Sequence, residues 1–290
     1  MKSIPRPRKQ LQTAANASMK GFTLVELLVA MVVSLLILTA AGAVYTVARQ
    51  GFQTNDDRTR TLESGRLALD ILTRNIRMAG AANPDLTGDF TTWSLPDPIE
   101  PMVGVEGGAL PDSITIAYVS DRAYNAARLA GSDCLGQPVG LDVVMNRFSI
   151  SADNQLQCAG NGGTPGSRVV GAAQPLVGPV VDLQITYSVV SLPGGAPLEK
   201  GLKEPEDVNT TVVTADLIPV GSWNTVRAIN FCIDVASFEP NTLERDPAGT
   251  PGVSPGLNCR GVAFAADGRV HRIFRATVNV RNSTRGDNRL

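Results

Sequence analysis

Few residues in this chain could carry catalytic chemistry. The single histidine, His271, excludes multi-histidine metal sites and argues against a Ser-His-Asp triad. The glycine-rich run 160–166 lacks a following Lys-Ser/Thr pair, which favours a flexible loop over a phosphate-binding loop. Glu204, Glu206 and Asp207 lack EF-hand spacing and indicate a solvated acidic loop. We therefore expect no enzyme activity, no cofactor and no metal, and we interpret His271 as structural.

Four cysteines are the other reactive side chains: Cys134, Cys158, Cys232 and Cys259. Their even number and the absence of a CxxC pair are typical of disulfides in an oxidising compartment, the alternative being free buried thiols in the cytosol. Four cysteines allow three connectivities. We favour sequential pairing, Cys134 with Cys158 and Cys232 with Cys259, because it closes two loops of similar length.

One carboxylate stands inside a long apolar run. From Phe22 to Val47 the sequence contains a single charged residue, Glu26. A helix rises ~1.5 Å per residue, so this run is long enough to span a hydrocarbon core of ~30 Å. A carboxylate at mid-membrane costs ~2.5 to 3.5 kcal/mol, although less near the interface. Glu26 therefore either has a function or extends to the interface as a snorkelling side chain.

The segment before the apolar run is basic, and the rest of the chain is mildly acidic. The first 21 residues contain no acid and five basic residues: Lys2, Arg6, Arg8, Lys9 and Lys20. The remainder has 21 of the 26 basic residues against all 27 acidic ones. By the positive-inside rule this asymmetry predicts a cytoplasmic N-terminus and a periplasmic C-terminal portion. Nucleic-acid binding is disfavoured, because no Lys/Arg stripe follows the leader and aromatic content is 5%.

Three processing routes compete for this N-terminal segment. It could be an ordinary signal peptide cut near Ala41-Gly42-Ala43, an uncleaved signal anchor, or a leader that is cut before the apolar run. The routes differ in where the mature chain begins. The charge of Glu26 argues against the first route, since the apolar region of a signal peptide carries no charge.

Residues 20–30, KGFTLVELLVA, closely resemble the class III prepilin site of type IV pilin-like proteins. The resemblance implies that a prepilin peptidase cuts after Gly21 and that the new N-terminal Phe22 is methylated. In this family the glutamate five residues into the mature chain pairs with the N-terminal amine of a neighbouring subunit, and Glu26 occupies that position. Pairing is physically reasonable, because an amine and a carboxylate that are each costly in lipid become tolerable together. Translation from Met1 or from Met19 gives the same mature protein.

An amphipathic segment follows the apolar run. After a polar stretch, apolar residues recur at helical spacing, namely Leu62, Leu69, Leu72, Ile76 and Ala79. Gly80 and Pro84 are stop signals. We expect one helix that continues out of the membrane and packs its second half against the rest of the chain. The predicted boundaries are a leader over 1–21, a transmembrane helix over 22–47, a periplasmic amphipathic helix over 48–82 and a β-rich head over 83–290.

The head is predicted to be an antiparallel sheet with long loops. Runs with strand character cover 113–119, 139–150, 180–190, 226–236 and 270–280. Gly/Pro-rich stretches between them predict surface loops at 159–166, 192–197 and 246–256. A sheet with one face on an amphipathic helix is a stable two-layer arrangement. The fold class is therefore α+β, and the prepilin resemblance implies the pilin fold.

Several later segments are similar to the PilW family of minor pilins: ESGRLALD at 63–70, RNIRMAG at 74–80, VVDLQITY at 180–187, VRAI at 226–229 and RIFRATV at 272–278. The resemblance implies a minor pilin in the complex that primes or caps a type IV pilus used in twitching motility and adhesion. The implied partners are other minor pilins, the major pilin, a tip adhesin, the inner-membrane assembly platform, the prepilin peptidase and membrane lipid. The implied location is the inner membrane in a single pass, followed by the pilus at the cell surface.

Two other functions remain open at this stage. A minor pseudopilin of type II secretion shares the leader, the fold and the assembly principle. A pilus-anchored recognition module would instead bind a surface, a glycan or DNA through its loops, although the low aromatic content argues mildly against a sugar platform. In each case small residues from Ala40 to Ala43 permit close approach of neighbouring helices in the membrane.

Overall fold

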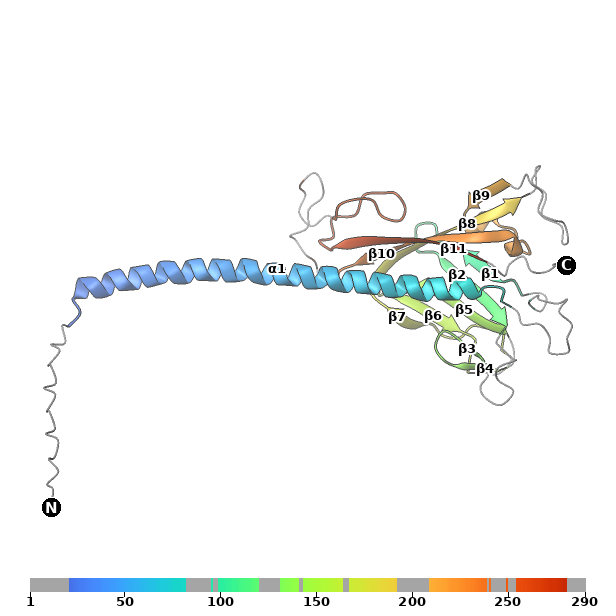
Figure 1. Ribbon diagram of the computed structural model, residues 1–290, viewed down its shortest axis with the longest axis horizontal. Coiled ribbons are helices and arrows are strands. Elements are labelled where there is room, and N and C mark those ends of the chain that lie inside the picture. The colour runs from blue at the N-terminus through green and yellow to red at the C-terminus, as the bar shows by residue number, and fades with distance from the viewer. Residues whose placement is uncertain are drawn as a thin grey trace, which may run out of the picture. The chain divides into compact units, whose positions relative to one another are not determined.

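The computed structural model describes residues 21–81, 95, 99–119, 131–140, 143–163, 167–191, 209–238, 240, 249 and 254–280 (Figure 1). The chain divides into two compact units, residues 1–52 and residues 53–290. We call the second unit the head. A single helix, α1 (Leu24–Met78), has its first half in the first unit and its second half in the head.

Helix α1 ends at a glycine cap. Gly80 adopts a positive φ of 70°, a conformation that glycine reaches without steric cost and that commonly terminates helices. Its N–H bonds to the carbonyl of Ala117 at 2.9 Å, which fixes the end of the helix to a strand of the head. The predicted continuous helix is confirmed by the 55-residue α1. The second predicted stop signal, Pro84, lies outside the described residues.

Most described strands form two antiparallel sheets. The five-stranded sheet has the order β1 (Met102–Val105), β2 (Ser113–Val119), β5 (Val143–Ile150), β6 (Leu156–Gly160) and β7 (Gln174–Val177). The four-stranded sheet has the order β11 (His271–Asn279), β10 (Val226–Ala236), β8 (Val180–Ser191) and β9 (Asn209–Val213). A small pair, β3 (Gly131–Ser132) with β4 (Pro138–Gly140), and two short 3₁₀ turns, η1 (Ala215–Leu217) and η2 (Trp223–Thr225), complete the described elements.

The second half of α1 packs against both sheets (Figure 1). A Cβ on Gly65 would lie 2.0 Å from the Phe274 ring of β11, so only glycine permits this close approach of helix and sheet. Toward the five-stranded sheet, Asn146 of β5 donates to Asn75 Oδ1 at 3.1 Å. The core between these layers includes Ala68, Leu72, Ile76, Phe148, Leu183, Tyr187, Ile229 and Ile233.

The buried face of α1 differs in part from the predicted stripe. Leu72, Ile76 and Ala79 are buried as expected, but Leu62 is 40% exposed and Leu69 only partly buried. Thr61, Gly65 and Ala68 occupy the helix face instead. Small residues at these positions let the helix lie close to the sheet, and a search for large apolar side chains overlooks them.

The predicted fold class, a long N-terminal helix with antiparallel strands, is confirmed, while details of the head differ. The strands expected at 113–119 and 226–236 are found at those bounds, and the run at 139–150 is divided between β4 and β5. The described strands of the head form two main sheets where a single sheet was expected. The loop predicted at 159–166 begins later, because β6 continues to Gly160. The loop predicted at 192–197, and most of that at 246–256, lie outside the described residues.

Candidate functional site

The predicted processing site lies directly before α1. Thr23 accepts two hydrogen bonds from the first turn, at its carbonyl from the N–H of Leu27 (3.1 Å) and at Oγ1 from the N–H of Glu26 (3.3 Å). Thr23 is therefore the N-cap, and Thr-x-x-Glu has the spacing of a capping box. Residues 21–23 are not helical, so the Gly21–Phe22 bond stands outside the helix.

The same cap fixes the position of Glu26. As the third residue of α1, it lies in the first turn, where a carboxylate interacts favourably with the positive end of the helix dipole. Phe22 is 81% exposed, and no described residue lies within 4 Å of the position where a Cβ on Gly21 would be. The predicted scissile bond, the predicted new N-terminus and the carboxylate thus lie within about one helical turn of one another.

The apolar half of α1 has no protein partner within the described part of the chain. None of its most apolar stretch is buried within the described residues. By length and composition the helix can cross a membrane. Its exposed large side chains include Leu28, Val32, Leu35, Leu36 and Leu38. So continuous an apolar surface requires lipid or other apolar helices around it.

All four cysteines lie in the head. The structure pairs Cys134 with Cys158 and Cys232 with Cys259, the two pairings that the sequence favours. The second disulfide ties β10 to the segment that follows residue 253. Because this segment precedes β11, the disulfide and the strand hold it at both ends.

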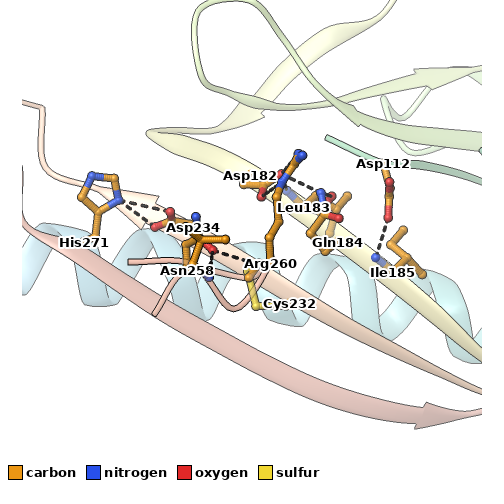
Figure 2. Close-up of a disulfide and its surroundings, with 12 residues drawn as sticks. Asp112, Asp182, Leu183, Gln184, Ile185, Cys232, Asp234, Asn258, Arg260 and His271 are labelled. Atoms are coloured by element: carbon orange, nitrogen blue, oxygen red, sulfur yellow. Dashed lines mark hydrogen bonds and ion pairs between the residues drawn. A yellow bond between two sulfur atoms is a disulfide. The ribbon is translucent and has the colours of Figure 1, made fainter. Parts of the chain in front are cut away.

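An ion pair that the sequence analysis missed lies beside the second disulfide (Figure 2). Arg260 contacts Asp182 of β8 through two nitrogens, at 3.1 Å from Nε to Oδ2 and 3.2 Å from Nη2 to Oδ1. It also donates to the carbonyl of Gly108, in the turn between β1 and β2. The hydrogen bond to Asp182 raises the pKa of Arg260, so the guanidinium stays charged. A bidentate pair of this kind fixes the segment on the outer face of the four-stranded sheet.

Asp112 links the two sheets, also in Figure 2. Its carboxylate accepts the N–H of Gly107 at 2.8 Å and that of Ile185 at 2.7 Å, while its own N–H donates to the carbonyl of Leu183 at 2.8 Å. Burial raises the pKa of Asp112, although both backbone donors oppose that effect. Its partners in β8 are far away in the sequence, and no local signal marks them.

His271 is buried between two carboxylates at the start of β11. Its Nδ1 lies 2.9 and 3.1 Å from the two oxygens of Asp234 on β10, and its Nε2 lies 3.1 Å from Asp267 Oδ2. Burial by itself would lower the pKa of His271, but the hydrogen bonds and charges of both carboxylates outweigh it and raise the pKa. The sequence prediction placed this histidine in the last strand without naming its partners.

Comparisons with known proteins give one motif match and two similar proteins. Residues 16–42 match the model of a family described as the prokaryotic N-terminal methylation motif. The pilin-like protein PilA3 of Thermus thermophilus is 28% identical over 163 residues, which cover 48% of this chain and 68% of that protein. A solved type IV-like pilin from Thermus thermophilus, TTHA1219, aligns with a TM-score of 0.42 and 13% identity over 78% of this chain and 98% of that one.

The matched motif contains the predicted cleavage site, the capped helix start and Glu26. It continues into the apolar part of α1 as far as Gly42. The chain thus combines a match to the N-terminal methylation motif with one long N-terminal apolar helix and antiparallel sheets, and it is similar to the pilin-like protein PilA3.

Proposed function

We propose that this protein is a minor pilin, cleaved after Gly21, methylated at Phe22 and incorporated into the complex that primes or caps a type IV pilus. The observation that carries the proposal is the position of Glu26 in the capped first turn of α1, one turn from the new N-terminus. The protein is then a substrate of the prepilin peptidase and its methyltransferase, and acts in assembly rather than as an enzyme.

The proposed topology follows from the helix and the charge pattern. The helix crosses the inner membrane once, from about residue 22 to 47, with the leader in the cytoplasm and the head in the periplasm. The predicted amphipathic segment over 48–82 contains the part of α1 outside the membrane, which ends at Met78, and the β-rich part of the head is predicted over 83–290. Both disulfides belong to the head, and this topology places them in an oxidising compartment.

The proposed partners bind mainly through the apolar half of α1. Other minor pilins and the major pilin would pack along it, with close approach at the small residues 40–43. In each contact the carboxylate of Glu26 would form an ion pair with the N-terminal amine of a neighbouring subunit. The assembly platform and a tip adhesin are the remaining proposed partners.

A Glu26→Gln substitution tests the assembly role. The amide keeps the shape of the side chain but cannot neutralise an amine in lipid, so we expect normal cleavage and membrane insertion with piliation close to that of a deletion strain. Surface pili are counted by electron microscopy, with processing followed by immunoblot. Glu63→Gln, an exposed site further along α1, is the matched control and should assemble normally. Full piliation by the Glu26 variant would contradict the role given to this carboxylate.

Deletion of the gene distinguishes the proposal from type II secretion. If the protein is a minor pilin, we expect the deletion strain to lose pili and twitching, and we expect the intact gene to restore both. Intact pili together with failed exoprotein secretion would identify a pseudopilin instead. Normal pili, twitching and secretion would reject both functions.

A further inference from the structure

A short, mostly exposed segment lies against the outer face of the four-stranded sheet. It runs from Gly261 to Gly268, and we call it the flap. The glycines at both ends have positive φ, 74° and 76°, a conformation that glycine adopts without steric cost because it has no Cβ. Between them, Phe264 is the buried residue, at 8% exposure. The flap therefore has permissive ends, and its first residues are bonded back to the preceding segment, Val262 to Asn258 and Ala263 to Leu257.

The flap is held to the sheet mainly through one side chain, His271. The Phe264 ring packs on the imidazole at a centroid distance of 4.8 Å, and Asp267 Oδ2 lies 3.1 Å from Nε2. On the far side of the ring, Nδ1 contacts Asp234 of β10. The base of the flap is fixed separately by the Cys232–Cys259 disulfide and by the Arg260–Asp182 pair, so any opening is confined to the flap.

We propose that the flap is a pH-dependent latch, closed when His271 is an imidazolium that bridges Asp234 and Asp267 and released when the ring loses its proton. Only the charged ring donates from both nitrogens. A neutral imidazole must present a lone pair to one of the two carboxylates, where the contact becomes repulsive. Release frees Phe264 and uncovers Asp234 on the sheet.

Other charges around the ring act on the same equilibrium. Asp182 on β8 adds to the negative potential at Asp234. Arg269, directly after the flap, interacts with Asp267. Arg272 donates to the His271 carbonyl at 2.7 Å. Burial would raise the pKa of Asp267, but the N–H of Arg269 and the contact with His271 lower it. Burial raises the pKa of Asp234.

These directions set the pH window of the latch. A histidine whose pKa is raised by folding stabilises the closed state fully below its ordinary pKa of ~6.5, and that stabilisation is lost as pH rises through the higher folded value. Asp267, with a lowered pKa, contributes above its ordinary value of ~3.9 and stops contributing as pH falls through its folded value. On acidification Asp234, whose pKa is raised, is protonated before Asp267, whose pKa is lowered. The latch therefore holds at mildly acidic pH and opens toward alkaline pH.

Hydrogen exchange on the full chain in detergent micelles tests the latch. Protection of peptides covering 261–268, corrected for intrinsic exchange rates, is measured from pH 5.5 to 9. The ring is titrated in parallel by NMR, which is unambiguous with one histidine in the chain. We expect protection to fall about tenfold or more across the His271 titration. Protection that stays constant through that titration would overturn the latch.

Two variants separate the latch from a general loss of stability. Asp267→Asn, at a side chain that is 38% exposed, should leave the head folded and remove the loss of protection at alkaline pH, because the amide can donate to the Nε2 lone pair of the neutral ring. His271→Gln should remove the pH dependence as well. Asp153→Asn, at an exposed turn, is the matched control and should behave like the parent protein. A parent-like pH profile in Asp267→Asn would also reject the proposal.

Discussion

Replacing Gly21 by leucine is expected to leave the protein as an unprocessed precursor in the membrane. A peptidase that cuts after glycine has no room for a bulky side chain at that position. The retained leader would keep its five basic residues in the cytoplasm and would leave Phe22 without the free amine that methylation and pairing with Glu26 require. Immunoblots of membrane fractions should show the slower-migrating form alone, and pili should be lost as in a deletion strain.

Gly42→Leu is the matched control for this experiment. Among the described residues, a Cβ at either glycine would have nothing within 4 Å, so neither substitution disrupts a contact in that part of the chain. The Gly42 variant should therefore be cleaved normally, although its small-residue surface is altered. Normal cleavage of the Gly21 variant would contradict the assigned cleavage site, and failure of both variants would point to a general membrane defect.

Replacing Leu72 by alanine is expected to destabilise the head by about 2 to 5 kcal/mol, the usual cost of such a truncation in a close-packed core. Leu72 is 1% exposed and lies on the face of α1 that packs against the sheets. The loss is measured by denaturant unfolding of the full chain in detergent, followed by tryptophan fluorescence. Trp223 is a suitable probe, because it is 3% exposed and packs edge-on against Tyr187 at 5.0 Å.

Leu67→Ala is the matched control on the same helix. Leu67 is 51% exposed, so its truncation should change the unfolding free energy by less than ~0.5 kcal/mol. Equal effects of the two substitutions would mean that α1 does not pack on the sheets through the face containing Leu72.

The elements that the sequence predicts well are those with a strong local pattern. Helix α1 has a continuous apolar run, then apolar spacing of three and four, and Gly80 at its end. Strands β2 and β10 are rich in β-branched and apolar residues. The missed strands β1, β3, β6, β7 and β9 have two to five residues, and β7 contains Pro175, which a pattern search treats as a strand breaker.

The division of the strands into two sheets cannot be predicted from a local sequence pattern. It depends on which strands pair, and on contacts such as that between Asp112 and Ile185, which bind segments 73 residues apart. The burial of small residues on α1 cannot be predicted from the sequence either, because Gly65 and Ala68 contribute little to an apolar periodicity. Only the position of Phe274 in the folded chain explains the glycine at position 65.

The same distinction holds for the candidate functional residues. Gly21, Phe22 and Glu26 form one short motif at the start of a helix, so their association is visible in the sequence. Asp234 and His271 are 37 residues apart and meet through the pairing of β10 with β11. The Arg260–Asp182 pair joins residues separated by 78 positions. Neither cluster has a motif, and both follow from the folded arrangement alone.

The most direct test of the central claim is the N-terminus of the mature protein. Membrane-extracted protein from a host with a prepilin peptidase is analysed by intact mass and N-terminal sequencing. Cleavage after Gly21 predicts a chain that begins with methylated Phe22 and retains Glu26 at its fifth position. A chain that begins at Val44 would mean cleavage as an ordinary signal peptide, and would contradict both the membrane helix and the assembly role of Glu26.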